Sequence, residues 1–210
     1  MPKLSFVYFD VGGVALKDLS DTPKWDQILA ELGLNNFDPD QVESIYKSHD
    51  DSICTGKFDL DQLLPLYQQQ FGTVIPQEYS LLTTTIDNFA PNTDIWQIIE
   101  QCQKKAKIGL LTDMWPRMFP ELVKRQLLPP YTWDVIIDSS VEGVRKPMPE
   151  IYDLAQSRAG VPAAEILFID NREKNLVIPR AMGWQTFLYD SSNYDQASKE
   201  FATFINTFAI

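Results

Sequence analysis

The stretch Lys3-Leu-Ser-Phe-Val-Tyr-Phe-Asp-Val-Gly-Gly-Val14 decides the fold that the sequence predicts. Its mostly apolar run, with β-branched and aromatic residues, is typical of a strand buried on both faces, as in a parallel sheet. Gly12 and Gly13 end the run, because glycine accepts backbone angles that other residues avoid. Asp10 therefore stands at the carboxyl end of a buried strand, where open α/β sheets bind their ligands. A carboxylate there is costly unless a metal, a cation or amide donors hold it, so we expect a functional residue; a turn or helix cap is the alternative.

Three later segments place polar side chains in the same kind of position. Glu165-Ile-Leu-Phe-Ile-Asp-Asn-Arg-Glu-Lys-Asn175 repeats the layout of an apolar run with an aspartate at its end. Another predicted strand ends in the hydroxyl of Thr112. Gly143-Val-Arg-Lys-Pro-Met-Pro-Glu150 carries Pro147, which suits the first turn of a helix and predicts Lys146 at that helix's amino end. A carboxylate, a hydroxyl, a lysine and a second carboxylate thus follow one another, each at a strand end or a helix start.

With these segments the chain resembles the haloacid dehalogenase superfamily of hydrolases and phosphatases over nearly its whole length. The matching residues, in order of the four motifs, are Asp10, Thr112, Lys146, and Asp170-Asn171 with Asn175. The resemblance implies a small helical cap inserted after the first motif. Two positions depart from the family pattern. Gly12 stands where the family's phosphatases usually carry a second Asp, and Asn171 follows Asp170 where an acidic pair is expected.

Asp10 and Asp170 gain meaning as a pair. If their strands are neighbours, a strand spacing of about 4.8 Å brings both carboxylates around one point, where a proton or a cation must offset their repulsion. Mg²⁺ suits such a place, because it prefers oxygen ligands and is usually held by one or two carboxylates plus a substrate phosphate. The resemblance implies that Asp10, Asp170 and the backbone carbonyl of Gly12 hold Mg²⁺. We expect Asn171 to fix a metal-bound water and Asn175 to cap the following loop; a capping role for Asp170 is the alternative.

The resemblance implies a Mg²⁺-dependent phosphohydrolase that acts on a small phosphorylated metabolite through an aspartyl-phosphate on Asp10. Lys146 would neutralise Asp10 and the transferring phosphoryl group, as cations do in phosphoryl transfer. Thr112 would donate a hydrogen bond to the phosphoryl oxygens, although threonines are also common at strand ends. Arg145 and Asp113 are candidate substrate-binding residues together with Thr112 and Lys146, and solvated surface charges are an equal alternative for these two. For Lys146 the alternative is a solvated surface lysine.

Gly12 predicts how well such an enzyme works. The missing Asp would protonate the leaving alcohol, and general acid–base groups are worth about 10²–10⁴-fold. Turnover is therefore expected to be slow unless the leaving group is acidic or another residue substitutes. A metal-free 2-haloacid dehalogenase using the same Asp10 is one alternative function. A weakly catalytic protein that binds a phosphorylated ligand or a protein partner is another, motivated by Gly12 together with Asn171.

Composition bounds the partners and the compartment. The chain has 210 residues, 44% of them hydrophobic and 22% charged, with a net charge of −11. Such acidity argues against a nucleic acid or an anionic membrane surface as partner, because both need a basic footprint. No apolar run approaches the roughly 18 residues needed to span a membrane, and no signal segment precedes the first strand. We expect a cytoplasmic monomer or homodimer in which Cys54 and Cys102 are free thiols.

The remaining pattern predicts a doubly wound parallel-sheet, Rossmann-like α/β core with an inserted helical subdomain. The predicted strands lie near 3–9, 107–112, 134–138, 165–169 and 185–189. Helices are expected over 92–105, 117–127, 148–160, 172–183 and from 191 to 210. Between residues 18 and 88 only helices are expected, over 23–32, 39–47, 59–71 and 76–88. The core would comprise 1–17 and 89–210 and the cap 18–88. His49 is expected at an exposed helix end, and Trp115 either walls the substrate pocket or packs in the core.

Overall fold

The computed structural model describes residues 3–19 and 22–208, and its centre is a five-stranded parallel sheet. The strands lie in the order β5-β4-β1-β6-β7. Their bounds are Phe6–Phe9 (β1), Lys107–Thr112 (β4), Val135–Asp138 (β5), Ile166–Asp170 (β6) and Gln185–Leu188 (β7). The first strand occupies the middle and pairs with β4 on one side and β6 on the other. The predicted parallel α/β core is confirmed.

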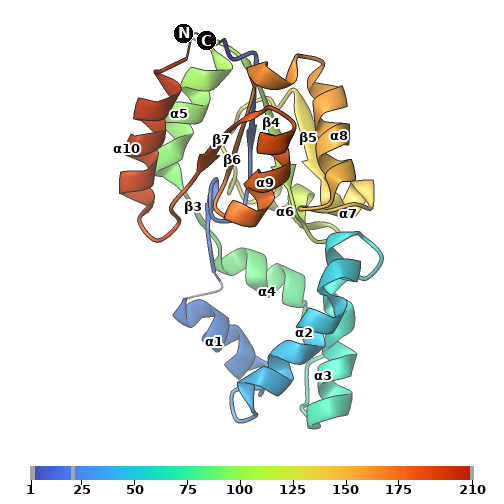
Figure 1. The fold of residues 1–210 in the computed structure, drawn as a ribbon. Helices are drawn as coiled ribbons and strands as arrows, with labels where there is room; N and C mark the ends of the chain where they lie inside the picture. The colour runs from blue at the N-terminus through green and yellow to red at the C-terminus, as the bar shows by residue number, and fades with distance from the viewer. Residues whose placement is uncertain (1–2, 20–21, 209–210) are drawn as a thin grey trace.

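Strand β1 is buried on both faces, as its unbroken apolar run predicts. Phe6 and Tyr8 join one apolar cluster, and Val7 and Phe9 join the other. Two pairs of helices cover these two faces of the sheet (Figure 1). The first face is covered by α8 (Pro149–Ala159) and α9 (Glu173–Ala181), and the second by α5 (Thr93–Gln103) and α10 (Tyr194–Ile205). Two shorter helices, α6 (Met118–Lys124) and α7 (Ser139–Glu142), follow β4 and β5.

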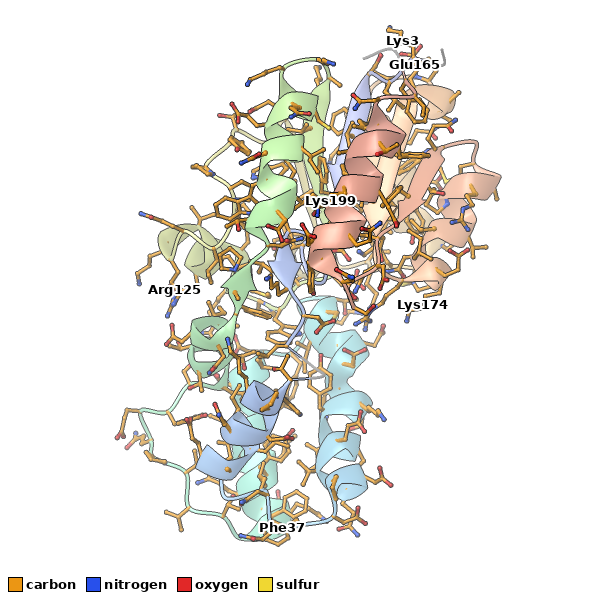
Figure 2. The ribbon with its side chains drawn as sticks, turned by 90° about the vertical axis from the view of Figure 1, so that its left-hand side faces the viewer. Lys3, Phe37, Arg125, Glu165, Lys174 and Lys199 are labelled. Carbon is orange, nitrogen blue, oxygen red and sulfur yellow. The ribbon has the colours of Figure 1, made fainter. Side chains whose placement is uncertain are left out.

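Four helices form a separate layer beyond one end of the sheet (Figure 1). They are α1 (Pro23–Glu31), α2 (Pro39–Cys54), α3 (Leu63–Phe71) and α4 (Leu81–Asn88), with a 3₁₀ turn over Leu60–Gln62. Figure 2 shows Phe37, in the loop before α2, at the far tip of this layer. The chain passes from the sheet to these helices and back through a two-stranded antiparallel ribbon of β2 (Leu16–Lys17) and β3 (Ala90–Pro91). Strands of two residues carry no readable pattern, and the sequence did not predict them.

Several boundaries differ from the sequence predictions. Helix α2 continues to Cys54, so the expectation of His49 at a helix end is wrong. The ring of His49 instead packs against Phe58, with 4.6 Å between the ring centroids. Helix α4 begins at Leu81 rather than near residue 76, because the Ser80 side chain caps it by accepting a hydrogen bond from Thr83 N. The tail helix spans residues 194–205, and positions 209–210 of the prediction lie outside the described residues, as do 1–2 and 20–21.

Cys54 and Cys102 are free buried thiols, as predicted. Over residues 3–19 and 22–208, no helix combines the length and the apolar character that crossing a membrane requires.

Candidate active site

Three of the sequence-predicted residues meet at the carboxyl end of the central strands. The Lys146 Nζ lies 2.9 Å from Asp10 Oδ2 and 2.7 Å from Asp170 Oδ2. Asp10 follows β1 directly and Asp170 ends β6, and the parallel pairing of these strands sets the two carboxylates side by side. The alternative of a solvated surface lysine is wrong, because Lys146 is only 2% exposed.

The backbone that carries Lys146 is fixed by its neighbours. Its amide donates to Asp113 Oδ1 at 2.9 Å, just beyond the end of β4. The ammonium also lies 5.4 Å from the centre of the Phe168 ring in β6, a favourable cation–π distance. Helix α8 begins at Pro149, one residue after the predicted start at 148, so Lys146 precedes the helix by three positions and does not stand at its amino end as predicted. Pro147 and Pro149 are equally suited to the first turn of a helix, and Pro149 is the one that occupies it.

Asp170 is fully buried and fully hydrogen-bonded. Asn175 Nδ2 donates to both of its oxygens, at 3.1 and 3.0 Å, and the amide of Arg172 donates to Oδ1 at 2.8 Å. Asn175 therefore orients Asp170, and its capping of the following loop stays a prediction. Asn175 is the third residue of α9 and lies five positions after Asp170, so the spacing alone did not show that its amide turns back toward this carboxylate.

The pKa values of the Asp10 and Asp170 carboxyl groups are shifted in opposite directions. Burial raises the pKa of Asp10 to about 7, with a further rise from the charge of Asp170, while the Lys146 ammonium opposes both. Burial also acts on Asp170, but Lys146, Arg172 N and Asn175 together hold the pKa of that carboxyl below its usual range. The neighbouring carboxylates raise the pKa of Lys146, so it stays charged. Asp170 and Lys146 thus form the fixed ion pair, and Asp10 is the carboxylate in need of further positive charge.

We expect Asp10→Asn to stabilise the metal-free protein in neutral solution. With a pKa raised from 3.8 to about 7, folded Asp10 keeps a proton that the unfolded chain releases. Its contribution is therefore fully present at lower pH and is lost as the pH rises from about 4 to about 7. The Asn variant lacks this loss, so its free energy of unfolding exceeds that of the wild type above about pH 7. Urea unfolding across this pH range measures it, with the exposed Asp153→Asn as control; parallel profiles for wild type and Asp10→Asn would contradict the assignment.

The glycine pair after Asp10 has two different roles. Gly13 has φ +76°, and a Cβ there would lie 2.0 Å from the Asn171 side chain, so only glycine fits. Gly12 is exposed, has no left-handed backbone, and a Cβ added to it would meet no atom within 4 Å. The loops that follow β1 and β6 therefore press together at Gly13, whereas Gly12 leaves open space where a side chain would fit.

The groups around Asp10 fit a hard cation. Asp10 lines a cavity and needs positive charge, and the Gly12 backbone lines the same cavity. The Asn171 Oδ1 is buried without a hydrogen-bond partner among the described residues, next to Gly13. Oxygen donors of this kind suit Mg²⁺. Asp170, in contrast, does not line the cavity, and within the described parts of the chain no three His, Cys, Asp or Glu side chains cluster as a metal site would.

A cavity of about 560 Å³ lies between this site and the helices α1–α4. The four predicted substrate-binding residues, Thr112, Asp113, Arg145 and Lys146, line it. Thr112 is 1% exposed, and among the described residues its hydroxyl makes only a long contact of 3.5 Å with the Asp113 carbonyl, so it is available to a ligand. Trp115 lines the cavity and also packs against the apolar core, so both predicted alternatives hold.

Arg145 joins the two layers of the molecule. Its guanidinium lies 2.6 Å from Asp50 Oδ2 in α2 and 3.5 Å from Asp113 Oδ2 beyond β4. Arg117 likewise binds Asp59 and Asp61, and Arg125 binds Asp87. The equal alternative of a solvated charge for Arg145 is wrong, and its ion pair with Asp50 explains why α2 extends beyond the predicted end. Although burial acts in the opposite direction, the Arg145 guanidinium lowers the pKa of the Asp50 carboxyl.

Sequence analysis missed one cation in the cavity lining. Arg172, two residues after Asp170, is exposed at the cavity and its side chain makes no hydrogen bond or ion pair with any described residue. Its position inside the fourth motif was a usable signal.

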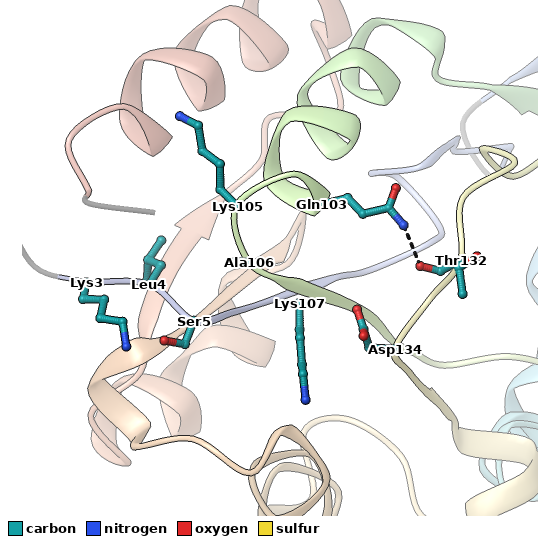
Figure 3. A pocket seen from close by; sticks show the side chains of 9 residues that line it. All are labelled: Lys3, Leu4, Ser5, Gln103, Lys105, Ala106, Lys107, Thr132 and Asp134. Atoms are coloured by element: carbon teal, nitrogen blue, oxygen red, sulfur yellow. Dashed lines mark hydrogen bonds between the residues drawn. The ribbon is translucent and has the colours of Figure 1, made fainter.

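A second hollow of about 520 Å³ lies at the opposite, amino ends of the strands (Figure 3). Lys3, Lys105 and Lys107 line it, and Gln103 Nε2 donates to the Thr132 carbonyl at 2.9 Å across its rim. None of the predicted site residues is part of it, so the cavity beside Asp10 is the candidate active site.

Residues 6–183 match a family model described as haloacid dehalogenase-like hydrolase. Acyl-CoA dehydrogenase family member 10 of Mus musculus is 33% identical over 58 residues, which are 28% of this chain and only 5% of that protein.

Two solved enzymes share the fold. A HAD family enzyme of Bacteroides thetaiotaomicron superposes with a TM-score of 0.77 at 16% identity, over 91% of this chain and 96% of that one. Its complex with magnesium and inorganic phosphate gives a TM-score of 0.72 at 16% identity, over 90% and 96%. The L-2-haloacid dehalogenase of Xanthobacter autotrophicus, with chloropropionic acid covalently bound, gives 0.59 at 18% identity, over 87% of this chain and 76% of that one.

Proposed function

Because the chain belongs to the haloacid dehalogenase-like hydrolases, we propose that it is a Mg²⁺-dependent phosphohydrolase acting on a small phosphorylated metabolite. The observation that carries the proposal is the contact of Lys146 with both Asp10 and Asp170 at the floor of a cavity. In that arrangement the Asp10 carboxylate lines the cavity next to the fixed positive charge of Lys146. The magnesium and phosphate complex of the Bacteroides enzyme, which has the same fold, supports this reading.

In the first step a carboxylate oxygen of Asp10 attacks the phosphorus of the monoester. The oxygen–phosphorus bond forms as the bond to the leaving group breaks, and the electron pair departs on the leaving oxygen, which then takes a proton. The Val11 amide, 2.7 Å from Asp10 Oδ1, and Lys146 fix the rotation of the nucleophile. Holding the reacting atoms in place lowers the entropic part of the barrier.

In the second step water attacks the phosphorus of the aspartyl-phosphate, which releases inorganic phosphate and a proton and restores Asp10. Lys146 offsets the negative charge of the phosphoryl oxygens in both steps, and the Thr112 hydroxyl, which lines the cavity, donates to one of them. Mg²⁺ would be held by Asp10 and the Gly12 carbonyl, with Asn171 Oδ1 close by, and would supply positive charge to the phosphoryl group when bound.

The open space at Gly12 predicts a strong dependence of rate on the leaving group. No side chain at this position protonates the departing oxygen, so activated phosphates are expected to react readily and simple alkyl phosphates poorly. Gly12→Asp restores a carboxylate and, since nothing blocks its Cβ, is expected to raise the alkyl phosphate rate about 10²-fold. Rates over a series of leaving groups measure both effects.

Gly12→Ala is the matched control, because it adds the Cβ without the carboxylate. A flat series for the native protein, together with fast metal-dependent turnover, would show that another residue or a water chain supplies the proton. Equal gains from the Asp and Ala variants would contradict acid catalysis at this position.

A metal-free 2-haloacid dehalogenase is the second candidate, favoured by one observation: Lys146 already neutralises Asp170, which does not line the cavity, whereas Asp10 does. In that reaction Asp10 displaces halide from carbon and forms an ester. Turnover of 2-chloropropionate against an aryl phosphate, each with and without Mg²⁺, separates the two. Halide release without metal and no phosphate release would replace the phosphohydrolase proposal.

A further inference from the structure

The wall of the active-site cavity that faces away from Asp10 is apolar and rich in rings. Helices α1–α4 contribute most of it. Its main side chains are Trp25, Leu29, Val42, Tyr67, Leu81 and, from the sheet layer, Trp115. Tyr67 and Leu81 are nearly inaccessible from outside, at 2% exposed each, so this wall is packed from behind and keeps its shape. A leaving group that lies against this wall therefore meets mainly carbon.

The charges around the cavity act against an anionic leaving group. Among the described residues of the lining there are six carboxylates and three cations. The carboxylates are Asp10, Asp18, Asp26, Glu43, Asp50 and Asp113. One of the cations, Lys146, is bound by Asp10 and Asp170, and a second, Arg145, is bound by Asp50 and Asp113. One phosphoryl group is thus matched beside Lys146 and Arg172, but a second anionic group on the substrate is repelled.

Gly12 adds an independent requirement. The leaving oxygen must depart without a proton from this position, which demands an acidic leaving group. The phosphates of apolar alkyl alcohols would pack against the apolar wall, but their leaving groups are not acidic. Small acyl phosphates have an acidic leaving group, but it is too small to contact the wall. Phenols and related enols satisfy both.

We propose, building on the phosphohydrolase function above, that the cavity selects phosphate monoesters of uncharged, apolar aromatic leaving groups, that is, aryl phosphates. Trp25, from helix α1, is the residue that discriminates them, because it supplies a half-buried ring to the wall. A ring of the substrate buried against such a wall gains affinity in proportion to the apolar area removed from water.

The first experiment compares substrates on the native protein with Mg²⁺. We expect 1-naphthyl phosphate to have a higher kcat/KM than three others: cyclohexyl phosphate, a hexose phosphate, and an aryl phosphate of equal leaving-group acidity that carries a ring carboxylate. Turnover of acetyl phosphate without this preference would overturn the substrate assignment and leave the phosphohydrolase function standing. Release of phosphate from none of the substrates, acetyl phosphate included, would overturn both.

The second experiment uses Trp25→Ala, with Trp96→Ala as the matched control. Trp96 in α5 is equally half-buried but does not line the cavity. Trp25→Ala is expected to raise KM for 1-naphthyl phosphate about 10-fold while acetyl phosphate kinetics change less than about twofold. The Trp96 variant keeps both values. If Trp25→Ala does not fold, Leu29→Ala on the same helix replaces it and is expected to raise KM for 1-naphthyl phosphate by a smaller factor. An unchanged KM for this substrate in whichever of the two variants folds contradicts the proposal.

Discussion

Asp10→Asn is expected to lower turnover of any phosphate substrate by at least about 10⁴-fold, the size of loss seen when a covalent nucleophile is removed. The amide oxygen is a poor nucleophile, and the change also removes the carboxylate that faces the cavity beside Lys146. Initial rates on acetyl phosphate and an aryl phosphate, at saturating Mg²⁺, measure this effect. The variant is expected to fold, since it loses a buried carboxylate that carries an unfavourable charge.

Asp138→Asn is the matched control for this variant. Asp138 ends β5 as Asp10 follows β1, and both are 7% exposed, but Asp138 lies outside the cavity lining and caps α7. Asn caps helices as well as Asp, so activity and fold are expected to stay near the native values. Near-normal turnover by Asp10→Asn would show that the reaction does not pass through this side chain.

Lys146→Met is expected to lower kcat about 10²–10³-fold and to destabilise the fold by about 3–5 kcal/mol. The ammonium is the partner of two buried carboxylates, and methionine leaves both without it. Turnover and urea unfolding at neutral pH measure the two effects on the same preparation.

Asp170→Asn in the Lys146→Met background separates stability from catalysis. Removing the uncompensated charge of Asp170 is expected to recover part of the lost free energy of unfolding without recovering turnover. If Lys146→Met alone keeps native turnover, the cation does not act on the phosphoryl group.

The sequence predicted most of the fold because the core elements have strong local patterns. Four of the five sheet strands contain apolar runs, β7 being half polar, and the runs that lead to Asp10 and Asp170 belong to neighbouring strands. The end of α2 was missed because its last turns are polar and depend on the contact between Asp50 and Arg145, 95 positions apart. No local signal encodes such a contact.

The sequence predicted which residues form the candidate site, but not which of them contact one another. Strand order brings Asp10 and Asp170 together, and Lys146 reaches both from the loop before α8, where its amide donates to Asp113. The direction of the Asn175 side chain depends on the exact start of α9, and the free Arg172 depends on which way a loop turns. The open space beside Gly12 could not be predicted from the sequence either, because a glycine is equally compatible with a left-handed backbone and with an empty neighbourhood.

The central claim is that a phosphoryl group passes through Asp10. Its most direct test is rapid quenching of the protein during turnover of a ³²P-labelled aryl phosphate with Mg²⁺, followed by mapping of the label on acid-stable peptides. We expect label on the peptide that contains Asp10, released by hydroxylamine as an acyl phosphate is, and absent from Asp10→Asn. Steady phosphate release with no label on that peptide, or label that persists in the Asn variant, would contradict the account.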